Sequence, residues 1–237
     1  MDFMLEQERI FPMKHLLYKY RHAYVFLYFL IYIPWFTWLE QTVKFPPKYM
    51  IEISLDYKIP FCEYFIIPYM LWFFFIAISV CYFFFQNRQE FYRLICLLFI
   101  GMTLFLIIST LFPNGQQLRP ITFERQNIFV QLVKRLYRLD TPTNILPSIH
   151  VYNTLCVYYA IKTSSHMQQH LSHNFYTIVL WLTRILSISI ILSTILLKQH
   201  SILDVIGAFL LFLLFCPMIY KVGAKHYSYD KEVFELH

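Results

Sequence analysis

The chain has 237 residues and a net charge of +6, and 58% of its residues are hydrophobic while only 14% are charged. Soluble domains carry about 25% charged residues, so this chain has too few charges to cover a soluble protein's surface. Apolar runs of about 18 or more residues recur, which is typical of membrane spans. The composition predicts an integral membrane protein and assigns the positive charge to loops that meet anionic head groups, not to nucleic-acid binding.

Six apolar segments predict an all-α, polytopic membrane protein with six transmembrane helices. In chain order they lie at about 23–39, 62–85, 91–112, 147–164, 175–197 and 200–221. No internal repeat is visible, so a single membrane domain is expected to occupy residues 1–237. The last two segments are nearly contiguous, which predicts a tight hairpin between them.

The polar segments between the spans set the expected orientation. Lys and Arg near the span ends are almost balanced between the two sides, and a small excess lies with the termini once Arg119 and Lys198 are assigned to a site. Both termini are therefore expected in the cytoplasm, with 1–22 as an N-terminal segment, 222–237 as a tail and 113–146 as an outer loop. The expected location is the plasma membrane.

The outer loop contains a pattern with helical periodicity. Apolar residues recur from Ile128 to Tyr137, and Lys134, Arg135 and Arg138 fill other faces. This predicts an amphipathic helix in the membrane interface between the third and fourth spans. Such a helix is either a plain surface connection or a lid for a lipid head group, and both interpretations remain open.

Two motifs flank this loop. Arg119, followed by Pro120, offers a planar fork that suits two phosphate oxygens, although an interfacial anchor is the alternative interpretation. Pro147 and Ser148 are typical of a helix start, where backbone N–H groups attract an anion and the Ser148 hydroxyl adds a donor. His150 in the first turn could protonate a leaving oxygen, or could be an ordinary interface residue.

A third motif joins the last two spans. Ser193 is followed by Lys198, His200 and Asp204, and the spacing of the last two places them on one helical face. A carboxylate on one imidazole nitrogen fixes the tautomer and leaves the other nitrogen free to attack, although a helix-packing pair is the alternative. An ionisable residue within a span usually marks a functional site.

The span count supplies an independent reason to group these motifs. The end of the third span, the start of the fourth, the end of the fifth and the start of the sixth must share one side of the membrane. The three motifs are therefore expected to form one phosphate-handling site at the outer face.

Together the motifs resemble the type 2 phosphatidic acid phosphatase superfamily of membrane lipid phosphatases. Arg119-Pro120, Pro147-Ser148-x-His150, Ser193, His200 and Asp204 match the family pattern in type, order and spacing, and the six-span layout covers most of the chain. The resemblance implies that a lipid phosphate monoester is hydrolysed through a phosphohistidine, without a cofactor or metal.

The resemblance also implies roles for the residues. His200 would be the nucleophile, Asp204 its orienting partner and His150 the general acid, while Arg119 and Ser148 would hold phosphoryl oxygens and Ser193 would support them. The partners implied are a lipid phosphate and the bilayer, and the oligomeric state stays open.

The sequence departs from the family at two cations. The expected Lys falls on Phe112 and the expected Arg on Thr194. Lys198 could compensate, as could cations of the outer-loop helix. This variant is similar to the branch of inositol-phosphorylceramide and sphingomyelin synthases, so a lipid phosphotransferase with an alcohol acceptor is an alternative. A catalytically degenerate lipid-binding protein is another.

The remaining candidate metal ligands fall outside this site. His166, His170 and His173 have a spacing that could place them on one helical face, but they lie in the polar loop between the fourth and fifth spans, on the opposite side. They are expected to be solvated. The five cysteines lack paired spacing and are expected to serve as packing residues.

Overall fold

A computed structural model describes residues 18–235, with side chains described for residues 18–221. The chain divides into two compact units, residues 1–37 and residues 38–237, which are considered one at a time below. Most of the predicted N-terminal segment 1–22, and the side chains of the predicted tail 222–237, lie outside the described residues.

The first unit is helical over its described part. The 3₁₀ helix η1 (Arg21–Tyr28) runs directly into α2 (Phe29–Thr42), which ends in the second unit. Rings one turn apart stack along it, with 5.8 Å between the ring centroids of Tyr28 and Tyr32. Arg21–Thr42 is long and apolar enough to cross a bilayer, and it includes the first predicted span.

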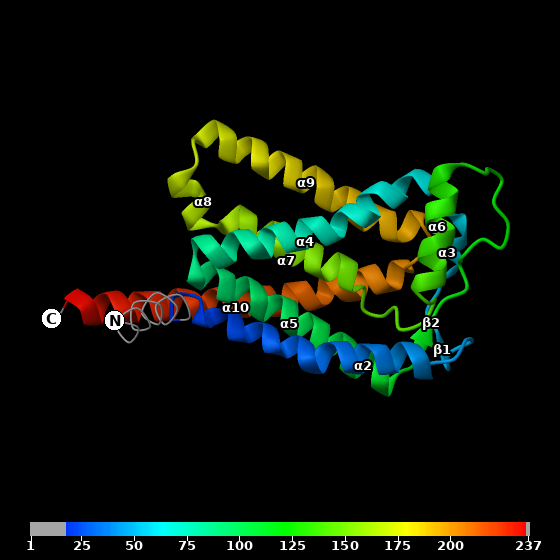
Figure 1. The fold of residues 1–237 in the computed structure, drawn as a ribbon, viewed down its shortest axis with the longest axis horizontal. Coiled ribbons are helices and arrows are strands. Elements are labelled where there is room, and N and C mark those ends of the chain that lie inside the picture. The colour runs from blue at the N-terminus through cyan, green and yellow to red at the C-terminus, as the bar shows by residue number, and fades with distance from the viewer. Residues whose placement is uncertain (1–17, 236–237) are drawn as a thin grey trace, which may run out of the picture. The chain divides into compact units, whose positions relative to one another are not determined.

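The second unit contains four long helices and several short elements (Figure 1). Its elements are β1 (Tyr49–Met50), α3 (Ser54–Lys58), η2 (Glu63–Phe65), α4 (Ile66–Gln86), α5 (Arg88–Leu111), β2 (Asn114–Gly115), α6 (Ile128–Leu139), α7 (Ile149–Thr163), α8 (Ser165–His170), α9 (His173–Leu196) and α10 (Ile202–Glu235).

Five segments in the described part of the chain could cross a bilayer, which confirms an all-α integral membrane protein. They are Arg21–Thr42, Glu63–Gln86, Arg88–Leu111, His173–Leu196 and Ile202–Lys221. The predicted fourth span appears as α7, whose 15 residues are fewer than the roughly 20 that a lipid-exposed span needs. In Figure 1 it begins short of the bundle end that carries α6, where a loop leads into it, and runs to the end at α8.

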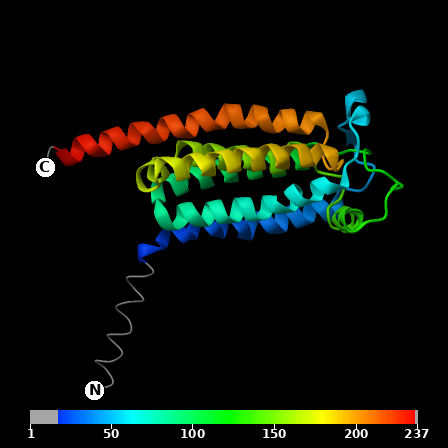
Figure 2. The same cartoon turned by 90° about the horizontal axis from the view of Figure 1, so that it is seen from above.

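The helix α7 is the centre of the bundle. It packs against α4, α5, α9 and α10, and Tyr152 and Val157 on it are fully buried. At Gly101 of α5 an added Cβ would lie 2.0 Å from the Tyr152 ring, so only glycine permits this close approach. Figure 2 shows α10 and α4 on opposite sides of the bundle.

The lipid-facing sides of the long helices are apolar. Ile78 of α4, Leu182 of α9 and Leu213 of α10 are each more than half exposed, as expected where hydrocarbon chains replace water. The backbone polar groups there are satisfied inside the helices.

The segment expected as the outer loop packs on one end of the bundle. Its helix α6 begins at the Asn127 cap and buries Val130 and Val133, the latter in a cluster with Ile66 and Leu197. Ile128 stays exposed. A two-residue parallel pairing of β1 with β2 fixes the start of the loop. The interfacial position predicted for α6 remains a prediction.

Candidate functional site

Three chain segments converge at the end of the bundle that carries α6. The start of α7 meets the start of α10 through the backbone, where Ser148 N donates to Asp204 O over 3.3 Å. The ring centroids of His150 and His200 lie 5.8 Å apart. Arg119 reaches the same region, because its guanidinium donates to the side chain of Gln199. The structure thus brings together the three motifs.

His200 and Asp204 form the predicted pair, although His200 lies before the helix. The connection between α9 and α10 is short, and α10 begins two residues after His200. His200 Nδ1 lies 3.4 Å from Asp204 Oδ2, and the Asp204 side chain is fully buried. The pairing leaves the Nε2 edge of the ring directed away from the carboxylate, as a nucleophile requires.

Hydrogen bonds at the start of α10 position Asp204. Ser201 Oγ accepts from Leu203 N over 3.1 Å, and Asp204 Oδ2 accepts from Ser201 N over 2.8 Å. This reciprocal arrangement satisfies donors at the start of α10. The carboxylate that faces His200 is therefore fixed by the backbone of the helix start.

His150 lies between aromatic side chains of α4. The centroid of its ring is 4.6 Å from that of Tyr69 and 4.3 Å from that of Trp72. Its Nε2 atom is buried and has no hydrogen-bond partner among the described residues. A buried polar atom without a partner is costly, so this nitrogen is a candidate to bind a substrate oxygen.

Arg119 is held by the end of α6. Its guanidinium donates to Tyr137 O over 3.2 Å and to Asp140 O over 2.8 Å, and it lies 4.5 Å above the Tyr137 ring. Tyr137 O belongs to the last turn of α6, whose carbonyls have no intrahelical donors, and Asp140 O belongs to the residue that caps this helix. Burial lowers the pKa of Arg119, and the negative charge of Asp140 opposes that shift.

Asp140 is a carboxylate in the site that the sequence did not indicate. Its Oδ2 accepts from Tyr69 over 3.4 Å and from Gln199 Nε2 over 3.3 Å. Burial raises its pKa, and the positive charges of Arg119 and His200 oppose this shift. The site therefore holds a second carboxyl group besides that of Asp204, and this group lies near Arg119.

Lys198 is bound to the segment around α3. Its ammonium donates to Asp56 O and to Ile59 O, both over 2.6 Å, and its backbone has a left-handed φ of 55°. Burial lowers its pKa, and the negative charge of Asp56 opposes the shift. The compensating phosphate contact predicted for Lys198 would require this ammonium to change partners.

Asp56 is a further residue that sequence reasoning missed. Its carboxylate is 1% exposed and accepts from Ser201 Oγ over 2.7 Å, from Ile202 N over 2.8 Å and from Ile53 N over 2.8 Å. It fixes the start of α10, and with it His200. A lone Asp in a polar loop gives no sequence signal for this role.

The predicted serines have local partners. Ser148 Oγ accepts from Val151 N over 3.4 Å at the start of α7, as the helix-start prediction required. Ser193 is fully buried, and its hydroxyl donates to Ile190 O over 2.6 Å. The two positions at which the resemblance leads one to expect cations carry uncharged side chains. Phe112 is a half-exposed helix cap, and the Thr194 hydroxyl donates to a carbonyl of its own helix.

The histidines at the opposite end of the bundle have packing partners. The rings of His166 and His170 stack with centroids 4.0 Å apart, and His166 Nδ1 lies 3.3 Å from the hydroxyl of Tyr82. No group of three or more metal-binding side chains occurs within the described part of the chain.

Comparison with family models, curated proteins and solved structures finds no match for this chain.

Proposed function

We propose that this chain is a membrane lipid phosphatase that hydrolyses a phosphate monoester through a phosphohistidine, as the resemblance to type 2 phosphatidic acid phosphatases implies. The observation that carries the proposal is the joint placement of His150, His200 and Asp204. The rings of His150 and His200 come from two helix starts with their centroids 5.8 Å apart, His200 Nδ1 lies 3.4 Å from the Asp204 carboxylate, and His200 and Asp204 are buried.

The proposed reaction has two displacements. His200 Nε2 attacks phosphorus, the bond from phosphorus to the lipid oxygen breaks, and protonated His150 gives its proton to that oxygen, releasing the lipid alcohol. Asp204 stabilises the imidazolium form of His200. Water then attacks the phosphohistidine and gives a proton to His150, which releases inorganic phosphate and restores His200. The chemistry implied by the family requires no metal.

Arg119 is the cation that we assign to the phosphoryl oxygens. Its present acceptors are neutral carbonyl oxygens of Tyr137, Asp140 and Gln199, and charged phosphate oxygens form stronger bonds with a guanidinium. Ser148 adds a hydroxyl at the start of α7, and Ser193 supports the helix end behind it. This exchange of acceptors also couples binding of phosphate to the position of α6.

We further propose that α7 is a sixth span. A helix surrounded by four others need not match the bilayer thickness, because it meets protein instead of lipid. With six spans, both termini lie on one side, proposed to be the cytoplasm of a plasma membrane, and the histidine site lies at the outer face. In this arrangement α6 lies in the outer interface.

A lipid phosphotransferase is the second candidate, favoured by Asp140. The site has a buried carboxylate beside Arg119, while Phe112 and Thr194 replace two cations of the family. Repulsion from this carboxylate disfavours a doubly charged monoester more than a singly charged phosphodiester. The same His200 and His150 would then transfer the phosphoryl-bearing head group to an alcohol.

The test compares the His200→Ala variant with the wild type in detergent and in vesicles. Phosphate release from lipid phosphate monoesters should be abolished in His200→Ala, while His170→Ala, at the opposite end of the bundle, should keep wild-type rates. Labelled phosphodiester lipid with and without an alcohol acceptor distinguishes transfer from hydrolysis by its product. Equal release by His200→Ala, or no turnover of either substrate class by the wild type, would refute the assignment.

A further inference from the structure

A single charged residue interrupts the apolar transmembrane segment formed by α9. Arg184 lies between His173 and Leu196, and no other Asp, Glu, Lys or Arg occurs between these ends. At about 1.5 Å per residue, the Cα atom of Arg184 lies about 17 Å from the start of the helix and about 18 Å from its end. Because the hydrocarbon core is about 30 Å thick, this position lies near the centre of the bilayer.

Arg184 lies on the outer side of the bundle. The helix α9 packs against α7 and α4, and in Figure 1 it lies along one edge of the bundle. Arg184 is exposed, and it shares this side of α9 with four apolar side chains that are between 53% and 62% exposed, those of Trp181, Leu182, Ile185 and Ile188. These five residues are called the α9 face below. The face presents a cation where the chain meets hydrocarbon.

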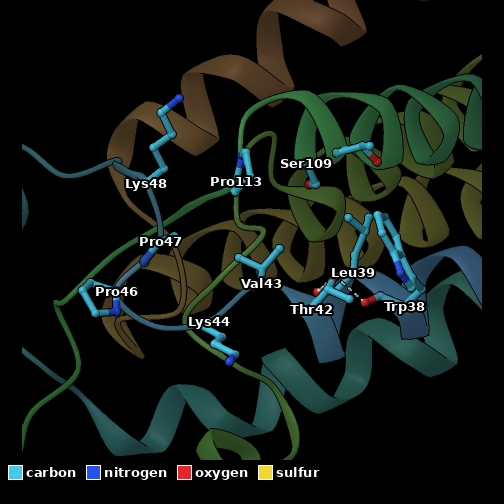
Figure 3. Close-up of a pocket in the computed structure, with 11 residues that line it drawn as sticks. Trp38, Leu39, Thr42, Val43, Lys44, Pro46, Pro47, Lys48, Ser109 and Pro113 are labelled. Carbon is cyan, nitrogen blue, oxygen red and sulfur yellow. Dashed lines mark hydrogen bonds between the residues drawn. The ribbon is translucent and has the colours of Figure 1, made fainter.

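Cations at the span ends of this chain have a different setting. Lys44 and Lys48 follow the end of α2 and line a pocket of about 310 Å³, and Figure 3 shows their ammonium groups directed away from this pocket. Both side chains are exposed beyond the end of the apolar segment, where a lysine reaches water. Arg184 does not reach such a level, because its guanidinium lies over Trp181, which is still about 12 Å from the start of α9.

The contacts of Arg184 within the described part of the chain leave its charge without a counter-charge. Its Nε donates to the hydroxyl of Tyr158 on α7 over 3.0 Å, and its guanidinium lies 4.6 Å from the centroid of the Trp181 ring. Neither group is an anion, and neither ion pair among the described residues includes Arg184. An ionisable side chain at this depth is costly and is usually paired with an opposite charge. The geometry therefore requires a carboxylate from outside the described residues.

A second copy of this chain does not offer that carboxylate. Within the described spans and α7, every carboxylate lies at the end of its segment, namely those of Glu40, Glu63, Glu90 and Asp204. A copy packed along α9 would therefore place no Asp or Glu at the depth of Arg184. Glu40 and Glu90 also accept hydrogen bonds from side chains of their own bundle. The counter-charge thus belongs to a different membrane protein.

We propose that the α9 face binds a transmembrane helix of another membrane protein, through an aspartate or glutamate that this helix carries near the bilayer centre. The carboxylate pairs with the terminal nitrogens of the Arg184 guanidinium, while Nε stays bound to Tyr158. The apolar side chains of the face pack against the partner helix on both sides of this pair. This inference does not depend on the proposed phosphatase activity, because no residue assigned to the histidine site belongs to the α9 face.

The experiment measures energy transfer between the labelled full chain and a labelled polyleucine peptide long enough to span the bilayer, both in phosphatidylcholine vesicles. One peptide carries Asp at its centre, and the reference peptide carries leucine there. The wild type should bind the Asp peptide about tenfold more tightly than the reference peptide. Arg184→Leu should lose this preference, whereas Arg184→Lys should keep most of it, which distinguishes lost charge from misfolding.

A matched control removes the same charge outside the membrane spans. Arg135→Leu changes an exposed arginine of α6 and should keep the wild-type preference. The proposal is overturned if the wild type binds both peptides equally, if Arg184→Leu keeps the preference, or if Arg135→Leu loses as much. It is also overturned if Arg184→Leu disrupts self-association of the chain, which would make a second copy the occupant, or if phosphatidylglycerol in the vesicles removes the preference, which would make a lipid the occupant.

Discussion

The buried carboxylate of Asp56 is expected to be a main determinant of the stability of the site. It accepts three hydrogen bonds of 2.7 to 2.8 Å, two of them from Ser201 and Ile202 at the start of α10. Hydrogen bonds to a charged acceptor contribute about 1.5 kcal/mol each at the lower end of their range. Asp56→Ala should therefore lower the free energy of unfolding by about 4 kcal/mol.

For a protein of this size about 4 kcal/mol corresponds to a fall of about 10 °C in Tm. Asp56→Asn keeps one oxygen and places an amide N–H against a donor. It should therefore lower the free energy of unfolding by about half as much as Asp56→Ala does. Thermal unfolding of the purified protein in detergent, scanned at one fixed rate, measures both variants. Activity of Asp56→Ala should also fall at temperatures where it is folded, because His200 precedes the same helix start.

Glu52→Gln is the matched control for this prediction. Glu52 lies four residues before Asp56 and also accepts two hydrogen bonds, from Tyr57 and from Gln117, but it is partly exposed. Its replacement should change the free energy of unfolding by less than about 1 kcal/mol. If Asp56→Ala melts within experimental error of Glu52→Gln, the carboxylate does not stabilise the start of α10 and the reasoning is refuted.

Three further substitutions test the surroundings of the site. Lys198→Met should lower Tm by about 5 °C through the loss of two bonds to carbonyls, and leave KM for lipid phosphate unchanged; a raised KM would place this ammonium on the substrate instead. The pKa of Asp140 is raised in the folded protein, so the folded protein binds this proton more tightly than the unfolded chain does. Stability should therefore fall as pH rises from the ordinary pKa of 3.8 through the raised value. Asp140→Asn should flatten this fall when Tm is measured against pH. Gly101→Ala should cost about 1–3 kcal/mol in thermal unfolding, because its Cβ would overlap the ring of the buried Tyr152; an unchanged Tm would contradict the close packing of α5 on α7.

The sequence was sufficient to predict the helices and the meeting of the three motifs. Apolar length predicted the long helices, and the parity of spans predicted that Arg119, His150 and His200 share one end of the bundle. Both arguments depend on the order of the segments along the chain and on the free-energy cost of polar groups in hydrocarbon. Both can be read from the residue types in the sequence. The short length of α7 was not predicted, because apolar length does not reveal that neighbouring helices enclose a segment.

The residues that hold the site could not be predicted in the same way. Asp56 and Tyr69 are far from the motifs in sequence and Asp140 lies outside them, and each takes its role from a side chain brought to it by folding. The phosphate contact expected of Lys198 from its place two residues before His200 stays a prediction. The bonds of its ammonium to the carbonyls near α3 could not be predicted from the sequence, because α3 lies far away along the chain.

The opposed charges near Arg119 connect the architecture of the site to its chemistry. Arg119 binds the carbonyl of Tyr137 in the last turn of α6 and the carbonyl of Asp140, which follows directly after this helix, so one helix end supplies both the acceptors of the cation and the competing anion. A phosphate that takes the guanidinium must release those carbonyls and meet the Asp140 carboxylate. A protonated Asp140 would instead donate a hydrogen bond to a phosphoryl oxygen. Burial raises the pKa of this carboxyl, and a bound dianion would favour its protonated form further. Binding of a monoester should therefore be accompanied by proton uptake, and binding of a diester by a smaller proton uptake.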